Sequence, residues 1–315
     1  MKKLFILILC VLLIPCAALA ELTVYFLDVG QGDCAIIECD GEAMIIDGGL
    51  PGQSSKVYSF IESKSAIFTS FEFMIATHPD NDHIGGLPAA IQAAAKNLKK
   101  KVNTIYSPVK EHDSPRFADL QKLADENHAK IKIPYDKDTI NLGKAKVTFY
   151  NCSHEKKNVV RSAFDWVKSR FRRDDPEEDK ENNDMSLVVK IVYGDTSFLF
   201  TGDIETDAES RLLSNGIDLN ADVLKIAHHG SSSSSSSSFL EKVNPKYAVI
   251  SCGKGNRYKH PHQQTLDELK NRSIDLYRTD LQGMITCHSD GHHVTFETEK
   301  KANSSLLFTS PEKNQ

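Results

Sequence analysis

The chain has 315 residues, of which 40% are hydrophobic and 26% are charged, a composition typical of a globular enzyme with a sizeable core. Its formal net charge of −5 provides no overall basic surface for nucleic acid, although bound divalent metals would add positive charge locally. Two of the seven cysteines lie within the first 20 residues, and the other five are scattered without a C-x-x-C pair. This pattern argues against a disulfide scaffold and a thiolate zinc site.

The N-terminal residues 1–20 predict a secretory signal peptide. Two lysines open the segment, an apolar run follows over residues 4–14, and Ala18-Leu19-Ala20 fits a cleavage site. The alternative is an uncleaved membrane anchor, but the apolar run is shorter than a spanning helix requires. We therefore expect an exported protein, periplasmic or extracellular, with no integral membrane segment after cleavage. One folded domain is expected over 21–300, and a disordered tail over 301–315.

Three predicted strands begin the domain, and two of them end in glycine-rich turns. The first strand leads into Asp28-Val29-Gly30-Gln31-Gly32-Asp33, and the third ends in Asp47-Gly48-Gly49. An aspartate at a strand end is placed to orient a metal-bound histidine from behind, a role we assign to Asp47. The alternative is an ordinary Asp-Gly turn. The predicted strands cover residues 22–27, 34–38 and 43–46.

The densest group of potential ligands is His78-Pro79-Asp80-Asn81-Asp82-His83. A buried strand is predicted before it and a helix after it, so the six residues occupy a strand-to-helix loop. Side chains two apart can share a face, whereas neighbours diverge. We therefore expect His78 and Asp80 to hold one metal ion, and Asp82 and His83 a second. The alternative is a solvated polar turn.

After three further predicted strands and a helix, residues 153–184 form a charged insertion that is more typical of a solvated face than of a phosphate-binding surface. The polar residues Asn183, Asp184 and Ser186 then precede a predicted strand. The next strand ends in Thr201-Gly202-Asp203, which places the Asp203 carboxylate at a strand end, where it could bridge two metals.

The last third of the domain contains more candidate ligands. His228 and His229 follow a strand over 223–227, and surface histidines are the alternative interpretation. The eight serines from Ser231 predict an active-site loop with a serine N-cap for the next helix, rather than a flexible linker. A further loop contains His260 and His262. Strand-rich segments alternate with helices in two halves, which predicts a layered α/β sandwich.

Taken in order, these motifs resemble the metallo-β-lactamase superfamily, and most closely a free-standing, exported hydrolase domain of ComEC-type competence proteins. The likeness covers roughly residues 22–297. It is carried by Asp47, His78-x-Asp80-x-Asp82-His83, Asp203 and His228-His229, and by the segments 28–33, 77–86, 183–187, 201–203, 228–231, 260–262 and 277–280.

The resemblance implies a four-layer αβ/βα sandwich over 21–300, with the site along the sheet edges. The superfamily loop is usually His-x-His-x-Asp-His, and here Asp80 replaces the second histidine. The separate histidine ligand before the bridging aspartate is also not evident, since Asn183, Asp184 or Ser186 occupies that stretch. Two divalent ions are expected, manganese or zinc, with magnesium as a further alternative. The oxygen donors of this site shift the preference toward manganese or magnesium.

The expected function is a secreted phosphodiesterase or nuclease that uses a hydroxide generated at a metal ion, with DNA as one candidate substrate. Asp82 would orient the nucleophile, His260 or His262 would donate a proton to the leaving oxygen, and Ser231 would contact the phosphate. The second ion would take one of His228 and His229, with Asp203 bridging. The alternatives are a metallo-hydrolase of a lactone, β-lactam or thioester, and a non-catalytic secreted module that binds DNA or cell wall.

Overall fold

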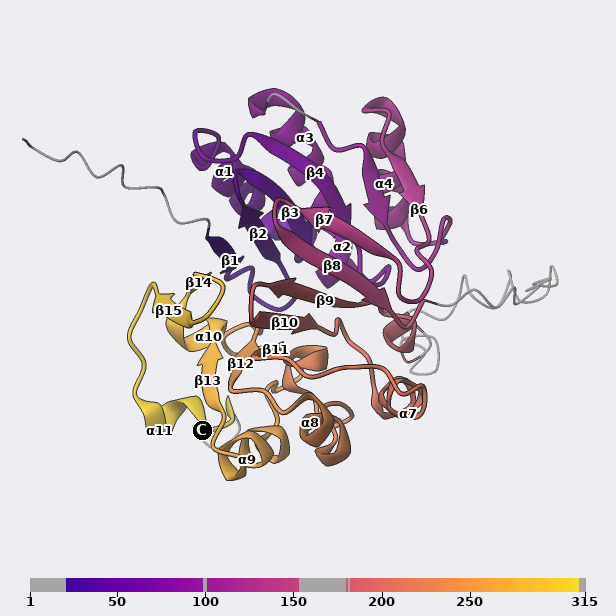
Figure 1. Cartoon of the computed structure of the whole chain (residues 1–315). Helices are drawn as coiled ribbons and strands as arrows, with labels where there is room; N and C mark the ends of the chain where they lie inside the picture. Colours follow the sequence, from indigo (N-terminus) through magenta and orange to yellow (C-terminus); the bar gives the residue numbers. More distant parts are fainter. Residues whose placement is uncertain (1–20, 99–100, 153–179, 181, 312–315) are drawn as a thin grey trace, which may run out of the picture.

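The computed structural model describes residues 21–98, 101–152, 180 and 182–311. The predicted signal peptide and most of the charged insertion over 153–184 therefore lie outside the described residues. Within the described ranges the strands form two mixed sheets, here called sheet A and sheet B (Figure 1).

Sheet A has eight described strands in the order β15-β14-β1-β2-β3-β4-β5-β6, and β3 to β6 run parallel to one another. Its strands are β1 (Leu22–Phe26), β2 (Ala35–Cys39), β3 (Glu42–Ile46), β4 (Ser70–Ile75), β5 (Thr104–Tyr106), β6 (Lys130–Lys132), β14 (Ile285–Ser289) and β15 (Val294–Thr298).

Sheet B has seven described strands in the order β13-β12-β11-β10-β9-β8-β7, and β10 to β13 are parallel. Its strands are β7 (Thr139–Leu142), β8 (Ala145–Tyr150), β9 (Val188–Tyr193), β10 (Thr196–Phe200), β11 (Val223–Lys225), β12 (Tyr247–Ile250) and β13 (Asp275–Arg278).

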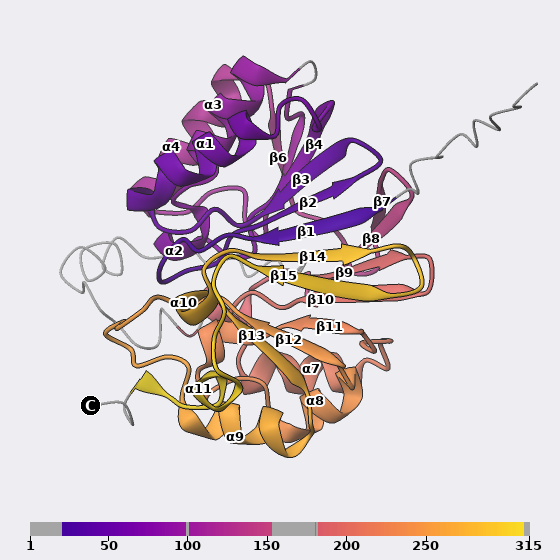
Figure 2. The same ribbon diagram turned by 90° about the vertical axis from the view of Figure 1, so that its left-hand side faces the viewer.

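Helices cover the outer face of each sheet, so the layers run helix, sheet, sheet, helix (Figure 2). The predicted four-layer α/β sandwich is confirmed. No helix in the described part of the chain is long and apolar enough to cross a membrane. Sheet A carries α1 (Ser54–Ser63), α3 (Leu87–Asn97) and α4 (Pro115–Glu126), and sheet B carries α7 (Thr206–Ser214), α8 (Ser237–Val243) and α9 (Gln263–Asn271). Shorter turns are η1 (Pro51–Gln53), α2 (Asn81–Ile84), η2 (Ala227–Gly230), α10 (Thr279–Gln282) and α11 (Ser304–Leu307).

The central strands are apolar on both faces because each sheet is covered on both sides. In β1, Val24 and Phe26 belong to the core between the sheets, whereas Tyr25 packs under the helices of sheet A. Phe26 stacks on Phe200 of sheet B with ring centroids 5.9 Å apart. This inner core holds the two sheets in a fixed relation, and the parallel strands of both sheets deliver their carboxyl ends to one edge, the usual position of a site in such folds.

The C-terminal segment packs on sheet B through a buried arginine. Arg278 is 1% exposed, and its Nη1 donates hydrogen bonds to the carbonyls of Leu307 and Thr309 at 2.9 and 2.8 Å. Ser310 is buried and donates its backbone N–H to Gln263. The predicted disorder over 301–315 is therefore wrong for residues 304–310. The polar composition of this segment gave no sign that the buried guanidinium of Arg278 would bind it. Residues 312–315 lie outside the described part.

Candidate metal centre

The loop after β4 supplies one half of the site. His78 stands three residues beyond β4, and Asp80 is the N-cap residue of the short helix α2. The sequence predicted a plain loop here, whereas α2 places Asp82 and His83 on a helical turn. Because of this turn, the side chains of Asp82 and His83 point in directions different from those of His78 and Asp80. One short segment can therefore supply ligands to more than one position.

Asp47 fixes the orientation of this half from behind. Its Oδ1 accepts the backbone N–H of Thr77 at 2.8 Å, and its Oδ2 accepts the Thr77 hydroxyl at 2.6 Å. The same Oδ2 accepts a hydrogen bond from Nδ1 of His83 at 2.8 Å. The opposite ring nitrogen, Nε2, is thereby directed at the site, as expected when a carboxylate supports a metal-binding imidazole.

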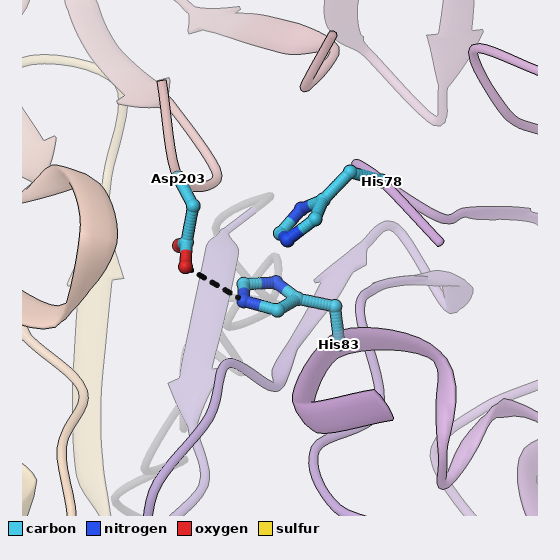
Figure 3. A group of neighbouring side chains, drawn as sticks. All are labelled: His78, His83 and Asp203. Atoms are coloured by element: carbon cyan, nitrogen blue, oxygen red, sulfur yellow. Dashed lines mark ion pairs between the residues drawn. The ribbon is translucent and has the colours of Figure 1, made fainter. Parts of the chain in front are cut away.

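The other half comes from sheet B. Asp203 follows β10, and its Oδ2 lies 3.3 Å from Nε2 of His83, as Figure 3 shows. His229 Nε2 lies 3.3 Å from Oδ2 of both Asp82 and Asp203. The rings of His78 and His83 are 4.0 Å apart, centre to centre. Side chains from two sheets thus converge on one small volume.

This arrangement fits a divalent metal. The Nε2 atoms of His78, His83 and His229, and Oδ1 of Asp203, are buried and have no hydrogen-bond partner among the described residues. Ligand atoms bonded to one ion at about 2.0–2.2 Å stand about 3.0–3.6 Å apart, which matches the 3.3 Å separations above. Four overlapping sets of potential ligands lie within 4.8 Å in the described part of the chain: His78 with His83 and Asp203, Asp82 with His83 and His229, Asp33 with Asp203 and His229, and Asp33 with Asp47 and His83.

The electrostatics of the cluster agree with this assignment. Burial alone would lower the pKa of His83 and His229, but nearby carboxylates, Asp203 foremost, raise both well above the ordinary value. Burial would raise the pKa of Asp203, yet His229 and His83 lower it well below its usual range. In the metal-free protein the imidazoles therefore hold protons that a metal ion would displace.

Asp80 and His78 form a further pair in the cluster, in which Asp80 is partly exposed and His78 is buried. The Asp80 Oδ2 lies 3.8 Å from Nε2 of His78, and its Oδ1 accepts a hydrogen bond from the Asn182 amide at 3.0 Å. Burial, followed by the charge of Asp82, raises the pKa of Asp80 to about 6. Burial, followed by His83, lowers the pKa of His78 to about 4. His78 is thus neutral at pH 7 and has a lone pair available.

The stretch that lacks the expected histidine ligand supports the site indirectly. Ser186 Oγ lies 3.2 Å from Nδ1 of His78 and accepts the backbone N–H of Asp203 at 3.1 Å. Asn183 donates to Glu205 at 3.3 Å, and Asp184 accepts the backbone N–H of Glu205 at 3.0 Å. Ser186 therefore orients two candidate ligands, whereas Asn183 and Asp184 position Glu205.

The structure distinguishes the two adjacent histidines. Both residues have left-handed backbone angles, with φ of 48° at His228 and 54° at His229. His229 reaches the buried cluster, whereas His228 Nε2 stays 4.0 Å from Asp203, and its Nδ1 lies 3.2 Å from a carboxylate oxygen of Glu205. The geometry favours His229 as the ligand. The sequence analysis did not single out Glu205. The available signal was its position two residues after Asp203, the aspartate at the strand end.

The serine-rich segment is a folded loop. Ser236 caps α8 by accepting the backbone N–H of Phe239, as predicted. Glu209, which is buried, accepts the backbone N–H of Ser236 at 3.0 Å and that of Ser235. Ser231 Oγ lies 2.9 Å from Ser233 Oγ. The predicted contact of Ser231 with a phosphate stays a prediction.

The two histidines around the cis His260–Pro261 bond have different surroundings. His262 accepts the backbone N–H of Ser232 at Nδ1, at 3.0 Å, and its Nε2 lies 3.2 Å from the Tyr258 carbonyl. Both of its nitrogens are engaged, so it joins two loops. His260 is buried with its ring 5.4 Å from that of His228. Burial, then the neighbouring imidazoles, lowers its pKa to about 3, so it is neutral at pH 7.

Two buried charges were also missed. Asp33 and Lys225 form an ion pair at 2.7 Å, and Asp33 Oδ1 lies 3.1 Å from Nδ1 of His229. The available signals were an aspartate at the end of a glycine-rich turn and a lysine within an otherwise apolar strand.

Comparison with known proteins identifies the class. The family model of the metallo-β-lactamase superfamily matches residues 27–155 and 184–254, more than half of the chain. The chain therefore belongs to the metallo-β-lactamase superfamily. This membership, together with the His/Asp clusters, supports a metal-dependent hydrolase.

Similar curated proteins confirm the ComEC-like character. ComE operon protein 3 of Bacillus subtilis is 29% identical over 289 residues, covering 86% of this chain and 33% of the relative. Competence protein ComA of Neisseria gonorrhoeae is 39% identical over 123 residues, covering 39% of this chain and 18% of ComA. The chain thus spans about a third or less of the length of these relatives.

Among solved structures, unliganded yeast PDE1 superposes with a TM-score of 0.52 at 12% identity, covering 85% of this chain and 99% of PDE1. CmlA, a diiron β-hydroxylase from Streptomyces venezuelae, gives 0.50 at 13% identity, covering 85% of this chain and 54% of CmlA. At such identities the likeness supports the fold alone.

Proposed function

We propose that this protein is an exported phosphodiesterase that uses two divalent ions, manganese or zinc, and that its substrate is a nucleic acid, with DNA as the first candidate. The observation that carries the proposal is the convergence on one volume of three buried imidazole nitrogens and a buried carboxylate oxygen, none of which has a hydrogen-bond partner in the described part of the chain. Export rests on the predicted signal peptide.

The site would hold two ions. His78 and Asp80 would bind the first, Asp82, His83 and His229 the second, and Asp203 would contact both. Such ions lower the pKa of a bound water to about 7 and neutralise phosphate oxygens. An acidic chain needs this neutralisation to bind an anionic substrate. Asp47 and Ser186 would keep the imidazoles oriented, and Asp82 would orient the water that attacks the substrate. His260, whose ring lies 6.3 Å from that of His229, would be the group for the leaving oxygen rather than His262, whose two nitrogens are engaged.

The loop over 253–262 supports a polymeric anion as substrate. In a chain with a net charge of −5 it carries three cations, Lys254, Arg257 and Lys259, and no acid. All three are exposed, and Tyr258 between them is 47% exposed. Because the Tyr258 ring stacks on His260, the loop adjoins the site. Proteins bind single-stranded nucleic acids with cations along the phosphate backbone and with aromatic rings that stack on the bases.

The test uses the chain from residue 21, stripped of metal and supplied with Mn²⁺, Zn²⁺ or Mg²⁺. We expect restored cleavage of bis(p-nitrophenyl) phosphate and of single-stranded DNA, with no hydrolysis of nitrocefin or a lactone. Asp82→Ala should be inactive on both phosphodiesters, whereas Asp218→Ala, on the far side of sheet B, should retain activity.

Other outcomes would redirect the proposal. Cleavage of the small diester alone would exclude a nucleic-acid substrate. Hydrolysis of a lactone or nitrocefin without phosphodiester cleavage would favour a carbonyl hydrolase, and the absence of bound metal would favour a non-catalytic binding module.

A further inference from the structure

A lysine is buried in the core between the two sheets. Lys225 ends β11, and its side chain points to the same face as Val223, which belongs to the apolar inter-sheet core. It is only 3% exposed. A buried ammonium group costs free energy unless it is paired and hydrogen-bonded, so its retention at this position calls for a specific role.

The contacts of Lys225 lead directly to the metal centre. Its Nζ donates to Oδ2 of Asp33 at 2.7 Å and to the carbonyl of Ile226 at 2.9 Å. Asp33 comes from the turn after β1 in sheet A, so the ion pair crosses from one sheet to the other. A cavity of about 10 Å³ beside the pair, lined also by Asp47, Thr77 and Ser251, holds at most one water molecule.

Asp33 is connected to both halves of the site. Its backbone N–H donates to the carbonyl of Asp82 at 3.1 Å, and its own carbonyl accepts from Gly49 at 2.7 Å. Its Oδ1 lies 3.1 Å from Nδ1 of His229. Gly32 makes this approach feasible, because a Cβ at its position would lie 2.3 Å from the Asp82 carbonyl oxygen.

His229 needs such support because its backbone is strained. A left-handed φ is uncommon for residues other than glycine and persists where the surroundings impose it. Nδ1 of His229 donates to the Ser251 carbonyl at 2.9 Å and faces Asp33 at the same time. The hydrogen bond to Ser251 and the ion pair with Asp33, whose Oδ1 has no hydrogen-bond partner among the described residues, set the ring plane. They direct Nε2 toward Asp82 and Asp203.

We propose that Asp33 and Lys225 are a positioning pair: Lys225 anchors the Asp33 carboxylate in the inter-sheet core, and Asp33 holds His229 in the orientation that completes the second metal site. The inference rests on the proposed metal centre and is independent of the substrate. Without the lysine, the carboxylate has no fixed counter-cation at Oδ2 and turns away from the imidazole, so His229 loses one of its two supports.

The test measures metal binding directly. The purified protein is loaded with Mn²⁺ or Co²⁺ by titration, and the stoichiometry and affinity are measured by competition with a chromophoric chelator. We expect Lys225→Met and Asp33→Asn each to weaken the second ion about 10–100-fold, as loss of a partner behind a metal-binding histidine does. The Co²⁺ absorption spectrum should change in the same variants, since it reports the coordination of the ion.

Two further variants separate positioning from stability. Lys190 is the control, a buried lysine of β9 in the same sheet whose partner Asp218, at 2.9 Å, is exposed. Lys190→Met should lower the melting temperature without changing metal affinity. The double variant Asp33→Asn with Lys225→Met removes both buried charges, so it should regain stability relative to the single variants while its metal affinity stays low.

The proposal is overturned if the Asp33 and Lys225 variants bind both ions as tightly as the wild type while only their melting temperatures fall. The pair would then be a structural contact between the sheets. If the double variant is the only one that folds, its affinity alone decides. If the wild-type protein itself binds no metal, the proposed function fails together with this inference.

Discussion

The two halves of the metal centre are built in different ways. The sheet A half is local: His78, Asp80, Asp82 and His83 lie within six residues, and one helical turn sets their directions. The sheet B half brings Asp203 and His229 from the ends of neighbouring parallel strands. A short motif can be oriented by its own backbone, whereas distant ligands need contacts that cross between sheets.

The residues that support His83 and His229 differ in the same way, lying within sheet A for His83 and across both sheets for His229. His83 is backed by Asp47, whose carboxylate also holds the adjacent Thr77 through two hydrogen bonds. His229 is backed by a carbonyl and by Asp33, which needs a buried lysine beside it. The sheet B half therefore depends on more distant parts of the chain than the sheet A half does.

The largest loss of activity is expected from a substitution of Asp203, which lies between the two halves of the site. Asp203→Ala removes the carboxylate that lies 3.3 Å from both His83 and His229. Metal ions contribute several kcal/mol of charge stabilisation in such reactions, so turnover of bis(p-nitrophenyl) phosphate should fall by about 10³-fold or more. Circular dichroism checks that the fold is intact. Activity within tenfold of wild type would show that the halves do not share an ion through Asp203.

A change behind the sheet A imidazole should be milder. Asp47→Ala leaves His83 without its hydrogen-bond acceptor, and we expect metal affinity and activity to fall about 10–100-fold. Chelator competition measures the affinity. A loss equal to that of Asp33→Asn would show that the two supports are equivalent, and an unchanged affinity would show that α2 alone orients His83.

The loop over 253–262 belongs to the sheet B half and offers a test of substrate contact. Tyr258→Ala should raise KM for single-stranded DNA about tenfold, because stacking on one aromatic ring is worth about 1–3 kcal/mol per base. Turnover of bis(p-nitrophenyl) phosphate should stay unchanged. Lys144→Ala, on the hairpin between β7 and β8 beside Asp40, is the control. Equal losses on both substrates would contradict a role in binding the polymer.

Metal binding should release protons. The carboxylates raise the pKa of His83 and His229 well above the ordinary value, so the metal-free protein holds protons there at pH 7, and an incoming ion must displace them. Apparent affinity should therefore rise with pH. Calorimetric titrations in buffers of different ionisation enthalpy should count about one to two protons, and a buffer-independent heat would contradict this arrangement of charges.

The amino-acid sequence by itself determined the layered α/β class and the family, together with the sheet A half of the site. Those features can be predicted from short stretches of sequence. The signals are apolar strands of four to six residues, glycine-rich turns, and ligands at spacings of two within a single loop. Ser236 as the cap of α8 was likewise predictable, because capping is a local hydrogen bond.

Only the tertiary structure decided the rest. It favoured His229 over His228, showed that both nitrogens of His262 are engaged between loops, and ordered the C-terminal segment on Arg278. It also joined Asp33 to Lys225, residues almost two hundred positions apart in the sequence. The physical reason is common to all four: these side chains meet partners across loops or sheets, and no spacing along one chain segment encodes which buried charges will come within hydrogen-bond distance once the sheets pack.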